Sequence, residues 1–509
     1  MATSALVSTI KCCANLNVME KQKQVETTVV IEEAQKILFI ESKPIIEKFE
    51  VVNNSVKIDG IVNVQVLYLD KDNVNNILDF KTNFFETIDC KDSNFKALVE
   101  ANLVDINYKN VSETEIKIDT NVNLKVLAFI EEDQQIVNDS SLNLCTQSTT
   151  NYIQTLSAYK KFTIAESFEF ELSKGSLKIL DLSSTLLLND VYASNNIAVL
   201  NYSITTNLLY ELEDKTLLSK QIDSSYKYEL DLENGASDDK VIANVNIKHD
   251  EIKASFEELN GSNVVKIDYP MYGTILSLKS KQVESIVDAY SITQDVNLVF
   301  NSCDNLLVQG NYNSSEKIDA NLKIEKEYTS VEKVLAINGE NVTVTKALTS
   351  EDTLNLEGIA TANIVYQEYN QSTELKSINS ALIEMPFSLK ISCLGALEGD
   401  IVSCKPQIVN LDARIKRSTE LDVIASVKSN ITIFRKNTTS LLKSLELGEA
   451  KLQNEFGLSI YTIDKGKTFW DVAKNLSISQ LTLEKQNPTL NLPSEKNEKV
   501  VVYRQRDFK

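Results

Sequence analysis

Three stretches of alternating apolar and polar residues constrain the fold of this chain most strongly. They are VKIDGIVNVQVLYL (56–69), IAVLNYSITTNLLYEL (197–212) and LNLEGIATANIVYQEY (354–369). Alternation at period two predicts a strand with one buried face. Each stretch carries a tyrosine near its end, and Tyr68, Tyr210 and Tyr366 lie 142 and 156 positions apart (210 − 68 and 366 − 210). This spacing is too long for a solenoid repeat, so we predict tandem duplicated domains.

A second alternating strand follows each of the first three, in the same order. These strands are EIKIDTNVNLKVLAF (115–129), VVKIDYPMYGTILSL (264–278) and ELDVIASVKSNITIF (420–434). Each domain then holds two strand sets that pack as a sandwich. We therefore expect a mainly β protein with three tandem, sandwich-like domains over 36–150, 165–310 and 318–445, leaving residues 1–35 unassigned. The pattern is weakest in the second domain, where Asn201 replaces the glycine seen at Gly60 and Gly358.

Length and composition agree with several packed domains. The chain has 509 residues, of which 43% are hydrophobic, enough for globular cores. Its apolar runs are short, so we expect no direct membrane insertion. The first residues lack a basic lead and a long apolar run, so we expect no secretory signal and a protein that stays where it is made. The net charge of −20 argues against binding to nucleic acid.

The seven cysteines are scattered and form no C-x-x-C pair. A zinc knuckle and a thioredoxin-type redox pair are therefore not indicated. Reduced thiols in a cytosolic protein are the simplest interpretation. The adjacent Cys12 and Cys13 offer an alternative, a crosslink between molecules.

The sequence shows no catalytic motif. His249 is the single histidine and lies in the polar run NIKHDEIK, so we expect it to be exposed to solvent. Motifs for phosphate, dinucleotide or metalloprotease chemistry do not occur. Acidic pairs such as Glu131-Glu132 are typical of solvated faces. We expect no enzyme activity, no cofactor and no metal site.

The C-terminal stretch YTIDKGKTFWDVAKNLSISQLTLEKQNP (461–488) differs from the repeats. Thr468 and Asp471 have the spacing of a capping box that starts a helix. The apolar residues of this helix, and of a second helix capped by Ser479, form buried faces: Phe469, Val472, Ala473, Leu476 and Leu483. Pro488 ends the second helix, and KVVVY (499–503) supplies another strand. The sequence thus predicts a small βααβ module over residues 458–503.

Both parts resemble known domains. The C-terminal stretch resembles the LysM module through KGKTFWDVAKNL…NP, over residues 460–503. The repeats resemble the SPOCS domain of spore-forming Firmicutes through IDGIVNVQVLY, LEGIATANIVY and MPFSLKI. Three SPOCS domains followed by one LysM module resemble spore-coat morphogenetic proteins of the clostridial type. The resemblance implies a protein of the mother-cell cytoplasm that is recruited to the forespore surface. There its LysM module would dock on the coat-basement ATPase and tether other coat proteins.

The resemblance also suggests two sets of binding residues in the tail. LysM modules usually bind N-acetylglucosamine chains, and the corresponding loop residues here are Asp464, Gly466, Lys467, Thr468, Asn487, Pro488 and Leu490. Two departures from the LysM pattern, Lys467 and a loop SEKNEKV without glycine, fall near the sugar groove. A protein partner would instead contact Trp470, Ile463, Lys465, Gly466, Lys467 and Lys474. A partly exposed tryptophan is a natural interface anchor, and the alternative is a Trp470 half-covered by the module's own loops, in a module that serves as a stable cap.

Charge separates the tail from the rest of the chain. Residues 458–509 hold nine Lys/Arg and six Asp/Glu, a net of +3, so the first 457 residues hold 52 − 9 = 43 against 72 − 6 = 66, a net of −23. A basic tail on an acidic body suggests a partner of its own for the tail. We therefore expect a non-enzymatic coat scaffold. Two alternatives stay open, a peptidoglycan-binding protein of cortex or cell wall and a structural protein of a phage-tail-like particle.

Overall fold

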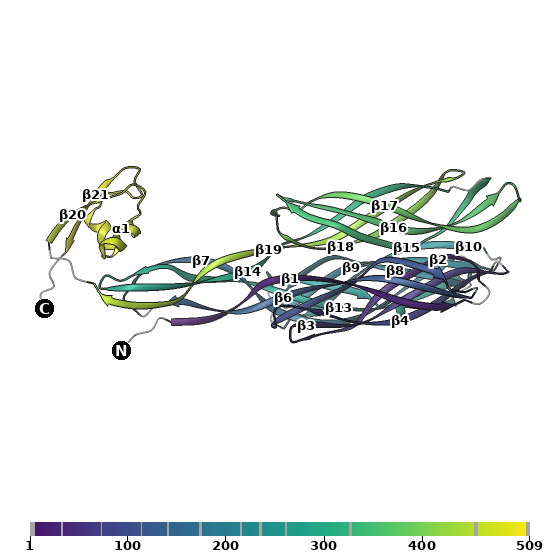
Figure 1. Cartoon of the computed structure of the whole chain (residues 1–509), viewed down its shortest axis with the longest axis horizontal. Helices are drawn as coiled ribbons and strands as arrows, with labels where there is room; N and C mark the ends of the chain where they lie inside the picture. Colours follow the sequence, from purple (N-terminus) through teal and green to yellow (C-terminus); the bar gives the residue numbers. More distant parts are fainter. Residues whose placement is uncertain are drawn as a thin grey trace.

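A computed structural model describes residues 6–31, 34–72, 74–112, 114–139, 142–172, 176–213, 216–233, 237–259, 262–324, 328–451 and 457–504. Strands dominate it, as the alternation predicts (Figure 1). Unit 1 contains β1 (Leu6–Val30), β2 (Ala34–Val52), β3 (Ser55–Asp70), β4 (Asn75–Asp89), β5 (Phe95–Asn110) and β6 (Glu115–Asp139). Unit 2 contains β7 (Cys145–Leu172), β8 (Ser176–Ser194), β9 (Ile197–Leu212), β10 (Leu217–Asp231), β11 (Lys240–Ile247), η1 (His249–Glu251), β12 (Lys253–Leu259) and β13 (Ser262–Tyr290).

Unit 3 and a small tail module complete the chain. Unit 3 contains β14 (Gln294–Lys323), β15 (Thr329–Ser350), β16 (Thr353–Asn370), β17 (Leu375–Ser392), β18 (Ile401–Arg417) and β19 (Glu420–Ala450). The tail module, residues 457–504, contains β20 (Gly457–Ile463), α1 (Phe469–Leu476), α2 (Gln480–Gln486) and β21 (Glu498–Arg504). Its β-α-α-β order is the one that the sequence indicates. Neither helix of the part that the structure describes is long and apolar enough to cross a membrane.

The same antiparallel topology occurs in all three units. One sheet is a meander, β2-β3-β4, β8-β9-β10 or β15-β16-β17. In the other sheet the last strand of the unit pairs with the first, as β1-β6-β5 and β14-β19-β18, and β13 pairs with β7 on one side and with β11 and β12 on the other. The two strands identified in each repeat are the central strands of these sheets, β3, β9 and β16, and β6, β13 and β19. Strand pairing thus groups the chain as residues 6–139, 145–290 and 294–450.

These groups begin earlier than the domain starts expected at residues 36, 165 and 318. The N-terminal segment forms β1, which pairs with β6 from Leu6–Asp139 to Val30–Glu115. The strands β7 and β14 pair with β13 and β19 in the same way. Each of these first strands lies at the edge of its sheet. Edge strands are covered on fewer sides, so their alternation is weaker and their limits are harder to predict.

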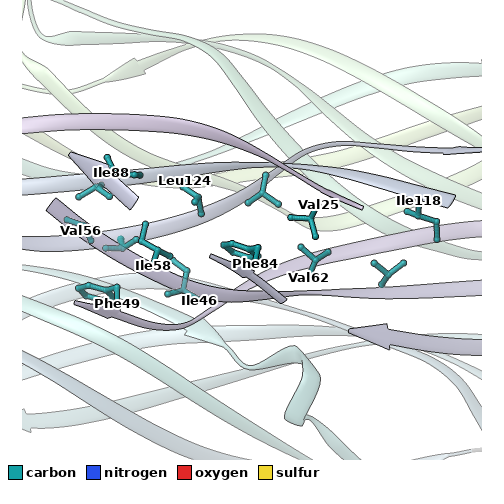
Figure 2. Packing of buried hydrophobic residues seen from close by; sticks show 14 of the residues in the cluster. Val25, Ile46, Phe49, Val56, Ile58, Val62, Phe84, Ile88, Ile118 and Leu124 are labelled. Atoms are coloured by element: carbon teal, nitrogen blue, oxygen red, sulfur yellow. The ribbon is translucent and has the colours of Figure 1, made fainter. Parts of the chain in front are cut away.

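Each unit packs its two sheets face to face. In unit 1, buried side chains of β3 and β4 meet those of β1 and β6 (Figure 2). The Phe84 ring covers Gly60 so closely that an added Cβ would lie 2.3 Å from Phe84 Cζ, and Phe387 covers Gly358 at 2.6 Å. In unit 2 the pairing places Tyr202, opposite Tyr226, at this position. The residue of unit 2 that corresponds to Gly60 and Gly358 is therefore Tyr202, and the expectation that it is Asn201 is off by one position. The stacked rings of Tyr202 and Tyr226 take the place of the Gly-Phe pair.

The three units share a central core. Leu67, Leu209 and Val365 immediately precede the repeat tyrosines and are buried together in one cluster. The tyrosines point the opposite way, each into the core of its own unit. Equivalent residues of the units thus meet around a common pseudo-threefold axis. The fold resembles a trimer made from one continuous chain.

The molecule is elongated (Figure 1). Its longest strand, β19, has 31 residues, which at about 3.3 Å per residue spans about 100 Å. The tail module lies at the end of the molecule where β1 begins and β19 ends (Figure 1). The sheet β15-β16-β17 lies toward the opposite end (Figure 1).

Candidate functional site

Local capping positions both helices of the tail module. Thr468 Oγ1 accepts a hydrogen bond from the Asp471 N–H at 3.2 Å, and the Asp471 carboxylate accepts one from the Thr468 N–H at 2.9 Å. This reciprocal pair satisfies N–H groups that helix α1 leaves open. Ser479 caps α2 through the Thr482 N–H at 3.1 Å. The short helices therefore begin where the sequence signals indicate.

The module packs its own core and then packs against unit 2. Its buried apolar residues are Val472, Ala473, Ile478, Leu483, Val500 and Val502. Tyr290, the last residue of β13, belongs to the same cluster. The Tyr290 hydroxyl donates a hydrogen bond to the Ile478 carbonyl at 2.8 Å. The tail is therefore docked on the end of β13.

Asp288 is the centre of this docking contact. Its carboxylate accepts a hydrogen bond from Trp470 Nε1 at 2.8 Å and two from Lys474 Nζ at 2.6 and 2.8 Å. The Trp470 ring also meets Tyr290 edge-on, with 5.0 Å between ring centroids. Next to it, Lys451 Nζ donates to Ser477 Oγ at 3.1 Å. The contact thus combines one apolar aromatic pair with a shared, charged hydrogen-bond acceptor.

The electrostatics of Asp288 depend on the tail. Partial burial acts to raise the pKa of its carboxyl, but the hydrogen bonds from Lys474 and Trp470 outweigh burial, so the pKa lies below its usual value. Burial, reinforced by Cys145, raises the pKa of Tyr290, so its hydroxyl stays protonated and available as a donor. The contact is formed as described when Asp288 is ionised.

The residues expected to bind a protein partner fall into two groups. Trp470 and Lys474 contact the body in this docked arrangement. Lys465, Gly466 and Lys467 lie exposed in the turn after β20, where Gly466 adopts a φ of +82° that favours glycine. Ile463 is half-buried and packs against the module core. The exposed turn and the Trp470 face are therefore distinct surfaces.

The residues expected to contact glycan are also divided. Asp464, Thr468 and Pro488 are exposed, together with Gly466 and Lys467. Leu490 packs against the module core. Asn487 is buried, and its amide binds β21 by accepting from the Val501 N–H at 2.8 Å and donating to the Val501 carbonyl at 2.8 Å. The Asn487 side chain thus holds the module together and is not free for a ligand.

A cavity of about 700 Å³ lies where the three units meet. Its walls come from β2 and β5, from β8 and β11, and from β15 and β18, equivalent strands of the three units, with further residues from β13, β16 and β17. His249 lies on this wall and is half-buried, so the expectation of a solvent-exposed histidine is wrong. Burial, with Lys43 and Lys405 nearby, lowers the pKa of His249 well below its usual value. The polar run around His249 gives no sign in the sequence that the folded chain half-buries this side chain.

Polar groups of all three units meet beside this cavity. Lys43 Nζ pairs with Glu41 Oε1 at 3.0 Å and donates to Ser183 Oγ at 2.8 Å. Burial, followed by the charge of Glu41, raises the pKa of Glu340 to about 7 and raises that of Asp181. These contacts join the units, and Ser183 Oγ also donates a hydrogen bond to Glu41 Oε1 at 3.2 Å. Over the described residues no cluster of three metal-binding side chains occurs.

Sequence reasoning missed Asp288 and Tyr290. Both lie at the end of a long strand, in a segment without motif or unusual composition, and only the folded chain brings them to the tail. The cysteines Cys12 and Cys13 are both fully buried. The suggested crosslink between molecules at these residues is therefore wrong for the folded protein, since a thiol of a second protein molecule cannot reach either buried sulfur.

Comparison with known families identifies two segments of the chain. Residues 33–111 and 330–416 match the family model described as SipL, SPOCS domain. The first segment covers β2 to β5, and the second covers β15 to β18, which are the equivalent strands of units 1 and 3. No curated protein matches the chain. In these two units the chain is similar to the SPOCS domain of SipL, a similarity that indicates a sporulation protein related to the spore coat.

Proposed function

We propose that the protein is a non-enzymatic scaffold of the spore coat. It would be made in the mother-cell cytoplasm and recruited to the forespore surface. In this proposal the tail module is a LysM module that binds the coat-basement ATPase, while the elongated body, three SPOCS domains packed around a common axis, contacts other coat proteins. The observation that supports it is the pair of SPOCS matches in units 1 and 3, combined with a separate tail of opposite charge.

The tail offers a basic surface to such a partner. Lys465 and Lys467 lie exposed in the turn after β20. On the separate face formed by helix α1, Trp470 and Lys474 already hold a carboxylate, that of Asp288. A surface that binds one acidic side chain through an indole N–H and an ammonium group can bind an acidic side chain of another protein in the same way. We therefore propose that the partner presents an acidic side chain that replaces Asp288.

This proposal makes docking and partner binding compete. Trp470 cannot pack against Tyr290 and form the centre of another interface at the same time. Loss of Asp288 should therefore weaken docking and leave the partner-binding surface intact. Loss of Trp470 should remove both.

The test measures the binding of the full chain to the purified ATPase, by co-precipitation and by titration. Trp470→Glu should weaken binding at least ~30-fold, since a desolvated tryptophan anchor is commonly worth ~2 kcal/mol or more. Asp288→Ala should bind as well as the unchanged chain or more tightly. Ile463→Arg is a weaker test, since this residue packs in the module core. Undiminished binding by a folded Trp470→Glu protein would refute the assignment.

Glycan binding is the second candidate, and the exposed turn from Asp464 to Thr468 favours it. Co-sedimentation of the full chain with purified peptidoglycan tests it. Retention that is lost in Lys467→Glu and kept in Trp470→Glu would support a glycan site on this turn. Absence of the protein from the pellet would leave the protein partner as the function of the tail.

A further inference from the structure

Two cysteines from distant parts of the chain meet in the core shared by the units. Cys12 lies on β1 and Cys303 on β14, with 291 positions between them. Their sulfur atoms are 3.7 Å apart, and both side chains are 0% exposed. The separation is that of two thiols in contact, and the sequence gives no hint of the pair.

The two strands have no backbone bonds to each other. β1 is the edge of the sheet β1-β6-β5, and β14 is the edge of β14-β19-β18. Around the sulfurs lie the apolar side chains of Ile10, Ala14, Ile136, Ile153, Val283 and Leu441, which come from all three units. Units 1 and 3 are thus held together here by side-chain packing, and the two thiols are in position to join them covalently.

The two thiols are not equivalent. Both sulfurs lie near the Asp304 carbonyl, Cys12 Sγ at 3.7 Å and Cys303 Sγ at 3.6 Å, and Cys12 Sγ also lies 3.6 Å from the Glu132 carbonyl. The hydrogen bond between the thiols, with burial, raises the pKa of Cys12. The same hydrogen bond lowers the pKa of Cys303. These directions favour Cys303 as the thiolate of the pair.

We propose that Cys12 and Cys303 form an oxidisable pair that closes into a disulfide between units 1 and 3. With hydrogen peroxide as the oxidant, the Cys303 thiolate attacks one peroxide oxygen, forms a sulfenic acid and releases hydroxide, which takes up a proton. The Cys12 sulfur then attacks the sulfur of Cys303, the S–O bond breaks, and water leaves. Two thiols and one peroxide give one disulfide and two waters. Peroxide is small enough to reach a buried pair through brief openings of the N-terminal edge strand.

The link would have a clear physical effect. It closes a loop of nearly three hundred residues and so restricts the unfolded chain, an effect that grows with loop length. It also ties β1, the first strand of the chain, to β14 of unit 3. The oxidised protein should therefore unfold at a higher temperature than the reduced protein, and its N-terminal strand should exchange amide hydrogens more slowly.

The test treats the purified full chain with hydrogen peroxide and then counts thiols in denaturant. The count should fall from seven to five, and peptide mapping should find Cys12 joined to Cys303. Cys303→Ala should keep all six remaining thiols. The matched control Cys13→Ala should still lose two thiols on oxidation, because Cys13 packs in a different cluster, with Phe129 and Phe434. A folded chain that keeps all seven thiols, or that joins other cysteines, would overturn the proposal.

Discussion

Removal of one carboxylate should release the tail from the body. In Asp288→Ala the Trp470 indole loses its acceptor and Lys474 loses its ion pair. A hydrogen bond to a charged group contributes about 1.5–3 kcal/mol. The ion pair adds at most about 1 kcal/mol, because Lys474 is 44% exposed and Asp288 25% exposed. The combined loss of about 1.5–4 kcal/mol corresponds to a shift of at least ~10-fold toward the undocked tail.

The chain reports this change by itself, because Trp470 is its single tryptophan. Release from the Tyr290 ring exposes the indole, so the emission maximum of Asp288→Ala should shift to longer wavelength and quenching by acrylamide should increase. Asp412→Ala is the matched control, since Asp412 is an exposed carboxylate paired with Arg414 at 2.7 Å. Circular dichroism should show the same strand content in all three proteins. Unchanged emission and quenching in a folded Asp288→Ala chain would refute the docking contact.

Docking should also depend on pH, because Asp288 has a lowered pKa when the tail is bound. A lowered pKa means that the contact contributes fully above the ordinary value of about 3.9 and is lost as the pH falls through the lowered value. The emission of Trp470 should therefore be constant from pH 8 to 5 and change only in acid. A change centred near neutral pH would point to another group.

Three further substitutions test the body. Phe434→Ala removes a fully buried ring that meets Phe129 edge-on and should lower the free energy of unfolding by about 3–5 kcal/mol; a loss under 1 kcal/mol in a urea titration would argue against the shared core. Gly358→Ala would place a Cβ 2.5 Å from a backbone oxygen and should cost about 2 kcal/mol, seen as a lower melting temperature; an unchanged melting temperature would contradict this close packing. His249→Gln should make stability less dependent on pH. The histidine pKa is lowered in the fold, so the unchanged chain loses up to about 1.4 kcal/mol per pH unit as the pH falls below about 6.5; equal slopes in the two proteins would show that His249 titrates freely.

The sequence predicts a strand well when neighbouring strands pair with both of its edges and its own alternation marks the buried face. The central strands β3 and β16 pair on both edges and alternate cleanly, so period two identifies them. The first strands β1 and β14 lie at sheet edges, and their limits follow from pairing with strands more than a hundred residues away. The two tail helices were predictable because Thr468 and Ser479 cap them through neighbours in the sequence. Local signals therefore give the elements and leave their arrangement open.

The site was less predictable than the fold. That Trp470 binds another protein stays a prediction from the sequence. The contact of Trp470 with Asp288 in the structure could not be predicted, because it joins residues 182 positions apart. The pair Cys12 and Cys303 and the enclosed position of His249 have the same origin. Each depends on how three units pack around an axis, and no single segment encodes that packing.

The position of β19 has a mechanical consequence. The tail follows β19 in the chain, so a pull on a tethered tail enters the body at the end of this strand. β19 is hydrogen-bonded to β14 from Gln294–Ala450 to Lys323–Glu420 on one side, and to β18 on the other. A force along the strand loads these hydrogen bonds in shear, all at once, and does not peel them apart one by one. The body can thus act as a stiff tensile element that carries load between a surface and the layer above it.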